Sequence, residues 1–185
     1  MIRGKKVILR TVSPDEVDQI YELITDINKK GLYWHLQIPP LNKFREEYRE
    51  TGFWSHDEGR MLILSHEGDY VGEILYFKGL DYQSGYEVGY ELFDMKYAGQ
   101  GYMTEALMLF CAYMFAVWPI NRLQVNVMSQ NIASIRVVEK CGFTYEGTMR
   151  QATFHNGVYH DLKLYSILRE ECPPLASLLA ENDAT

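Results

Sequence analysis

Two glycines stand where a predicted strand passes into a predicted helix. Residues 90–106 read YELFDMKYAGQGYMTEA, with Gly99 and Gly101 directly before an amphipathic segment. Glycine lets the backbone approach a ligand closely, and the first turn of a helix offers unpaired N–H groups that favour a phosphate. The segment matches neither a Walker loop nor a GxGxxG fingerprint. A diphosphate-binding loop and a tight turn without a ligand are both consistent with this spacing.

Two carboxylates precede the glycines on the predicted strand at residues 85–93. Because side chains alternate along a strand, Glu87 and Glu91 lie on one face, ~13 Å apart at about 3.3 Å per residue. That separation is too large for one shared proton, so we expect separate roles. Either carboxylate, as a general base, or a chain of water molecules can remove the proton of an ammonium group. Two solvated carboxylates on a half-exposed strand are the alternative.

A second motif follows the glycine segment along the chain. Residues 131–143 read NIASIRVVEKCGF, in which Asn131 can cap a helix that ends at Gly142. With both motifs the chain resembles the GNAT superfamily of acetyl-CoA-dependent N-acyltransferases. Within it, the chain is similar to the branch of the ribosomal-protein N-terminal acetyltransferases RimJ and RimL. The opening residues 8–10 (ILR) and the closing residues 161–168 (DLKLYSIL) extend the resemblance over about residues 7–171.

The resemblance implies a cosubstrate, acetyl-CoA, and no metal ion. In the family, a Gln/Arg-x-x-Gly-x-Gly/Ala loop holds the diphosphate of CoA, and the second motif lies along the pantetheine arm and the thiol. Backbone N–H groups at Leu92 and Phe93 would polarise the thioester carbonyl. The expected cofactor contacts are Leu92, Phe93, Ala98, Gly99, Gln100, Gly101, Tyr102, Met103, Thr104, Asn131 and Ser134.

The resemblance also implies which residues carry the reaction. Glu87 matches the strand position at which many relatives hold their general base. Ser134 matches a serine of the RimL-like branch and is the expected proton donor to the departing thiolate; a serine that bonds only its own helix backbone is the alternative. Three positions depart from the family pattern: Ala98 replaces Gln or Arg, Met103 replaces a small residue, and Val138 replaces a tyrosine of many relatives.

Histidines and aromatic residues occur in the segments that cover the acceptor site in relatives. Ordinary surface or packing roles are the alternative for these side chains. The expected acceptor-side residues are Tyr33, Trp34, His35, Tyr86, Glu91 and His155.

Hydrophobic periodicity indicates the elements that position these residues. Helices are predicted to start at Ser13, near Lys43, after Gly101 and after Asn131. Strands are predicted at residues 7–10, 60–64, 70–77, 85–93, 123–127, 143–153 and 159–168. This order predicts an α/β (α+β) GNAT-like fold, with a mixed, mostly antiparallel sheet of six to seven strands and helices on both faces. We expect a single domain at residues 1–172 and a loosely ordered tail at 173–185, after Pro173 and Pro174.

Composition excludes several classes of protein. The chain has 185 residues, with 18 Lys+Arg against 25 Asp+Glu and a net charge of −7, which argues against nucleic acid as a partner. No apolar run approaches the ~20 residues of a membrane span, and the apolar residues 7–9 are too few for a signal peptide, so none is expected. Cys111, Cys141 and Cys172 have no disulfide or zinc spacing, so a reducing cytoplasm is expected.

The expected function is acetyl transfer from acetyl-CoA to a primary amine by direct attack in a ternary complex. The acceptor would be a protein N-terminus or a small molecule such as an antibiotic, a polyamine or an aminoacyl conjugate, since the acidic chain suits a cationic amine. The chain would act as a monomer or homodimer, without a membrane partner. A catalytically silent module that keeps the fold and binds CoA is the alternative, favoured by Ala98 and Met103.

Overall fold

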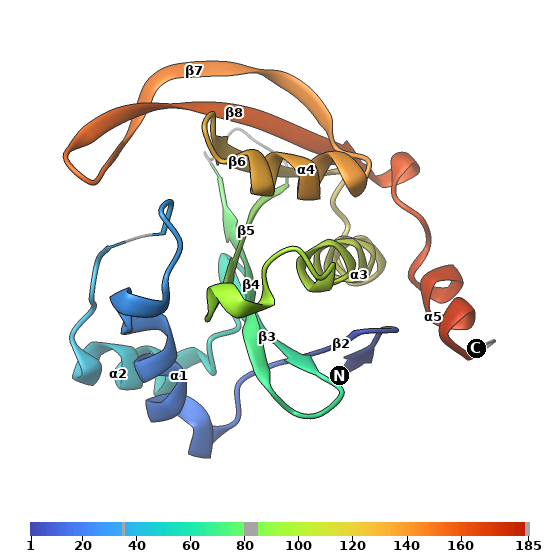
Figure 1. Cartoon of the computed structure of the whole chain (residues 1–185). Helices are drawn as coiled ribbons and strands as arrows, with labels where there is room; N and C mark the ends of the chain where they lie inside the picture. Colours follow the sequence, from blue (N-terminus) through green and yellow to red (C-terminus); the bar gives the residue numbers. More distant parts are fainter. Residues whose placement is uncertain (35, 80–84, 184–185) are drawn as a thin grey trace.

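The computed structural model describes residues 1–34, 36–79 and 85–183. One eight-stranded sheet with the order β1-β2-β3-β4-β5-β6-β8-β7 forms its centre (Figure 1). The strands are β1 (Ile2–Arg3), β2 (Val7–Arg10), β3 (Glu58–Ser65), β4 (Tyr70–Lys78), β5 (Tyr86–Leu92), β6 (Arg122–Met128), β7 (Thr144–His155) and β8 (Val158–Leu168). Neighbouring strands are antiparallel, apart from the parallel pair β5 and β6.

Helices cover both faces of the sheet, as Figure 1 shows. The helices are α1 (Val17–Thr25), α2 (Leu41–Thr51), α3 (Tyr102–Val117), α4 (Ile132–Lys140) and α5 (Leu175–Asp183). Short 3-10 helices are η1 (Pro14–Glu16), η2 (Ile27–Lys29), η3 (Met95–Tyr97) and η4 (Arg169–Glu171). None of the helices among the described residues combines the length and apolar character needed to cross a membrane.

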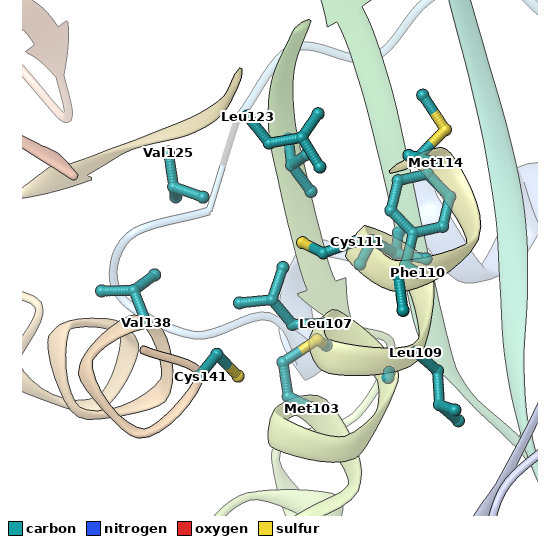
Figure 2. Close-up of a cluster of buried hydrophobic side chains, with 14 of the residues drawn as sticks. Met103, Leu107, Leu109, Phe110, Cys111, Met114, Leu123, Val125, Val138 and Cys141 are labelled. Atoms are coloured by element: carbon teal, nitrogen blue, oxygen red, sulfur yellow. The ribbon is translucent and has the colours of Figure 1, made fainter. Parts of the chain in front are cut away.

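Two hydrophobic clusters hold these layers together. The larger one joins α3 and α4 to the sheet, with Leu107 and Phe110 of α3 fully buried beside Leu123 of β6 (Figure 2). The smaller one lies under α1 and α2, around Ile20 and Phe44. Because side chains alternate along β5, its even-numbered residues face α3 and its odd-numbered residues face the opposite side.

The sheet is open along part of the β5–β6 pair. Only Tyr86 with Leu123 and Glu87 with Gln124 are paired, although β5 continues to Leu92 and β6 continues to Met128. Each strand keeps its other neighbour over this length, since β5 stays paired with β4 and β6 with β8. The two strands therefore separate beyond Glu87 and leave backbone groups of β5 without a strand partner.

The structure corrects two details of the predicted fold. The sheet has eight strands instead of six to seven, because the two-residue strand β1 is too short to show periodicity. In place of the loosely ordered tail expected at 173–185, the chain forms α5, and Leu175, Leu178 and Leu179 pack against the larger cluster. Pro173 and Pro174 precede this helix, a position that proline tolerates well.

Candidate active site

The loop between β5 and α3 turns the chain sharply at Gly99 and Gly101, where the sequence predicts a turn. The Asp94 carboxylate accepts a hydrogen bond from the Lys96 amide at 2.8 Å and caps η3. Gly99 and Gly101 then adopt φ angles of 75° and 86°, in the left-handed region that favours glycine. Gly101 is the N-cap of α3. The two glycines thus lead the chain directly into the helix.

The amides of this loop are available to a ligand. Among the described residues, no protein group accepts a hydrogen bond from the backbone amides of residues 99–104, whereas the Glu105 amide donates to the Gly101 carbonyl at 3.2 Å. These donors lie at the positive end of a 16-residue helix, which favours an anion. Met103 is buried in the core beneath the loop (Figure 2), so its side chain does not narrow the approach. The loop therefore fits a diphosphate.

A lysine distant in the sequence lies at the same loop. The Lys6 ammonium Nζ donates to the Gln100 carbonyl at 2.8 Å. The Glu105 carboxylate fixes the turn before β2 by accepting from the backbone amides of Lys5 and Lys6. Sequence reasoning missed this cation, because nothing in residues 1–10 shows that they fold against residues 100–105.

The open stretch of β5 presents backbone groups at regular spacing. The Phe93 amide donates to the Val71 carbonyl at 3.0 Å, so Leu92 and Gly72 form a pair without direct hydrogen bonds. By the alternation of an antiparallel ladder, the N–H and C=O groups of Leu92, Tyr90 and Val88 point away from β4, toward the opening. The Phe93 amide is committed to the ladder, which leaves the Leu92 amide as the donor for a bound carbonyl.

Helix α4 places Ser134 on the other side of this opening. Asn131 caps the helix as predicted, and its Oδ1 accepts from the Ser134 amide at 3.2 Å. The Ser134 Oγ lies 2.7 Å from the hydroxyl of Tyr90 on β5. Burial raises the pKa of Tyr90, so its phenol stays protonated. Val138, where many relatives carry a tyrosine, is fully buried in the core.

Glu87 lies on the opposite face of β5 and bonds to neutral amides of β6. Its Oε2 accepts from Asn126 Nδ2 at 2.7 Å and from Gln124 Nε2 at 3.5 Å. Burial raises the pKa of Glu87, and the two amide donors oppose the shift. The Asn126 Oδ1 is buried without a partner among the described residues, so the bond to Glu87 is what orients this amide.

Sequence reasoning missed both amide residues. Their signal was the alternation in residues 123–127, which places Gln124 and Asn126 opposite the buried Leu123 and Val125. Using that signal required knowing that β6 pairs with β5.

A cavity of about 270 Å³ opens beside Glu87. The expected acceptor-side residue Tyr86 also lines it, but the Tyr86 side chain is buried in the larger hydrophobic cluster on the other face of β5. Its hydroxyl donates to the His56 carbonyl at 2.8 Å. The lining residues are Gly79, Gly85, Tyr86, Glu87, Arg122, Gln124 and Leu164. A molecule in this cavity can exchange a proton with Glu87.

Glu91 belongs to a buried group of charges. Its carboxylate lies 3.3 Å from the Lys30 ammonium, with side chains 11% and 1% exposed respectively. Burial raises the pKa of Glu91 well above its usual range, and the nearby Glu73 carboxylate adds to the shift. Glu73 in turn pairs with Arg60 at 3.1 Å. The Lys30 ammonium also lies 3.4 Å from the ring centroid of Trp34, an attractive cation–π contact.

Two more expected acceptor-side residues join distant segments. The Tyr33 hydroxyl donates to the Gln130 carbonyl at 3.0 Å, between β6 and α4. His155, at the end of β7, is buried, and its Nε2 lies 2.8 Å from the Leu32 carbonyl. The β7–β8 hairpin thus reaches the loop between α1 and α2 (Figure 1). His35 lies outside the described residues.

Fold and loop together define the class of the protein as an acyltransferase. The model of the family described as "Acetyltransferase (GNAT) domain" matches residues 6–144. The chain therefore belongs to the GNAT acetyltransferases, and it is an N-acetyltransferase. Members of this family use acetyl-CoA, and the free amides of residues 99–104 fit that cosubstrate.

Individual relatives match over most of their length. The chain is 28% identical over 171 residues to the SPbeta prophage-derived uncharacterized N-acetyltransferase YokL of Bacillus subtilis, covering 91% of this chain and 93% of YokL. It is 28% identical over 163 residues to the ribosomal-protein-serine acetyltransferase of Escherichia coli, covering 85% and 90%. A structure of spermidine N-acetyltransferase from Vibrio cholerae in complex with CoA and spermine has a TM-score of 0.73 at 18% identity, covers 89% and 96% of the chains, and shows the same fold.

Proposed function

We propose that the chain acetylates a primary amine by direct attack on acetyl-CoA in a ternary complex, with Glu87 as the base. The observation that carries this proposal is the open β5–β6 ladder, which has Glu87 on one face and Ser134 on the other. A thioester in the opening can be approached by an amine from the side of Glu87. Its sulfur then lies toward Ser134.

The chain's residues divide the work in this proposal. The amides of residues 99–104 bind the diphosphate with help from the Lys6 charge, and the Leu92 amide polarises the thioester carbonyl. Glu87 takes a proton from the ammonium group and releases it to solvent through the cavity, which frees the nitrogen lone pair to attack the carbonyl carbon. After the attack the nitrogen loses its second proton by the same route. As the C–S bond breaks, the sulfur takes a proton through the Ser134 hydroxyl, which recovers one from solvent.

We propose a protein N-terminus as the first acceptor to test. The similarity to a ribosomal-protein-serine acetyltransferase supports this choice and a place near the RimJ and RimL branch. A polyamine is the second choice, because a net charge of −7 attracts a polycation. We further infer one acetyltransferase domain at residues 1–172, since both hydrophobic clusters pack on a single sheet, and α5 follows this range and packs against the larger cluster.

A thiol-release assay tests the proposal. The full chain is incubated with acetyl-CoA and a panel of amines that includes peptides with a free N-terminal serine, spermidine, an aminoglycoside and aminoacyl conjugates. We expect amine-dependent release of CoA and a rise in melting temperature with saturating CoA. CoA binding without turnover over the whole panel would support a silent CoA-binding module instead. An unchanged melting temperature would remove the proposed role of residues 99–104.

A further inference from the structure

Tyr90 is a polar residue of the opening to which the proposed mechanism gives no role. It stands on β5, on the face of the sheet that α3 and α4 cover, and its ring packs against the larger hydrophobic cluster. Its hydroxyl lies 2.7 Å from Ser134 Oγ and 3.3 Å from the Ser134 carbonyl. This contact joins the two sides of the opening at the residue expected to serve the thiolate.

The Ser134 hydroxyl has Tyr90 as its hydrogen-bond partner. A serine in the first turn of a helix often bonds a carbonyl of its own helix. Here the Ser134 Oγ bonds to the Tyr90 hydroxyl, and the cap on this helix comes from Asn131. The alternative of a serine that bonds only its own backbone therefore does not describe this structure.

The direction of that bond decides what Ser134 can do. A hydroxyl has one hydrogen to donate and two lone pairs to accept with. If Ser134 donates to Tyr90, its only hydrogen is used. If Tyr90 donates, the hydrogen of Ser134 is free to point at a sulfur atom in the opening. The Tyr90 hydrogen has two acceptors within reach, Ser134 Oγ at 2.7 Å and the Ser134 carbonyl at 3.3 Å, and the shorter contact favours Oγ. A phenol is also more acidic than an alcohol and is the better donor, and burial keeps this phenol protonated.

The surroundings of Tyr90 contain no competing charge among the titratable groups that act on it. These groups are the thiols of Cys111 on α3 and Cys141 after α4. Burial raises the pKa of both thiols, so both are neutral at ordinary pH. The Tyr90 hydroxyl is thus left with Ser134 as its polar partner in the described residues.

We propose that Tyr90 is a positioning residue that donates to Ser134 Oγ and thereby aims the Ser134 hydrogen at the thiol sulfur. This inference rests on the proposed function. Tyr90 acts through Ser134, so removing its hydroxyl matters only while Ser134 is present. The ring itself has a packing role that phenylalanine keeps.

The test compares Tyr90→Phe, Ser134→Ala and the double variant with the wild type in the thiol-release assay. We expect kcat to fall about tenfold in Tyr90→Phe, the loss of roughly one hydrogen bond in the transition state, with the KM for acetyl-CoA unchanged. The kcat of Ser134→Ala should be lower still, and the kcat of the double variant should equal that of Ser134→Ala alone. A purely structural tyrosine would instead lower the melting temperature and leave kcat per folded molecule unchanged.

Tyr165→Phe is the matched control. Tyr165 is also a buried tyrosine that reaches α4 from a strand, since its hydroxyl donates to Glu139 at 3.4 Å, but it does not contact Ser134. The kcat of Tyr165→Phe should equal that of the wild type. Effects of Tyr90→Phe and Ser134→Ala that multiply in the double variant, or a normal kcat in Tyr90→Phe, would overturn the role of Tyr90 alone. A wild-type chain without turnover would overturn the proposed function.

Discussion

Glu87 and Glu91 lie on the same face of the same strand, and their surroundings differ. Glu87 has two neutral amide partners and a cavity beside it. Glu91 faces Lys30 and Glu73 inside a buried group of charges. Burial raises the pKa of both carboxyls. A raised pKa alone therefore does not identify the base.

The partners decide which carboxylate can change its charge during a reaction. When Glu87 takes up a proton, it loses some hydrogen-bond strength to neutral amides and leaves no other charge unpaired. When Glu91 takes up a proton, the buried Lys30 ammonium loses its carboxylate partner. Breaking one side of a buried ion pair costs about 3–5 kcal/mol. Glu87 is thus suited to proton transfer, and Glu91 to holding the loop of Lys30 on the sheet.

The largest expected difference is in activity. Glu87→Gln should lower kcat by about a hundredfold to ten-thousandfold, the usual contribution of a general base. Glu91→Gln should lower kcat per folded molecule at least about tenfold less than Glu87→Gln does, because the proposed mechanism places Glu91 away from the reacting atoms. Thiol release at saturating acetyl-CoA measures both. Equal losses in the two variants would assign the base to both carboxylates or to neither.

Glu87→Gln, which should have the largest effect on activity, should have little effect on the stability of the fold. A raised folded pKa means that the stability contributed by Glu87 is present below the unfolded pKa and is lost as the pH rises through the folded pKa. At neutral pH the ionised carboxylate is already a cost, so Glu87→Gln should not lower the melting temperature. Thermal unfolding at pH 7 checks this, and a fall of several degrees would show that Glu87 is a structural carboxylate.

Lys30→Met should destabilise the fold by about 3 kcal/mol, because it removes the cation that faces Glu91, whereas Glu73 keeps Arg60. Urea unfolding measures the loss. Lys29→Met is the matched control: Lys29 pairs with Asp26 at 3.3 Å on the surface, where solvent screens such a pair and it contributes little to stability. Recovery of part of the loss in Lys30→Met combined with Glu91→Gln would locate the effect in this pair. Equal losses for both lysines would contradict it.

The smallest expected effect is a shift in the pH profile. Asn126 donates to the ionised form of Glu87 and so lowers its pKa; Asn126→Leu should raise that pKa. Since the base must be ionised, the acid limb of kcat/KM should move to higher pH, by about half to one pH unit for one hydrogen bond. Gln124→Leu, which removes the longer 3.5 Å bond, should move it less. A limb that stays in place in Asn126→Leu would show that another group limits the rate at low pH.

Local patterns predicted much of the site. The turn at Gly99 and Gly101 before a helix and the Asn131 cap are properties of short segments, and the structure has them where the sequence indicated. Alternation along β5 also put Glu87 and Glu91 on one face. Contacts between segments were not predictable in this way. Asn126 beside Glu87, Tyr90 at Ser134 and Lys6 at Gln100 all depend on how separate elements meet.

The sequence by itself determined which residues turn, cap and alternate, because backbone conformation depends on neighbours along the chain. Only the tertiary structure decided which carboxylate is paired with a cation and which with neutral amides. That choice follows from the separation of β5 and β6 and from the burial of Lys30, and both arise from packing between residues far apart in the chain. The charge that a side chain can carry is set by those neighbours and by the exclusion of water.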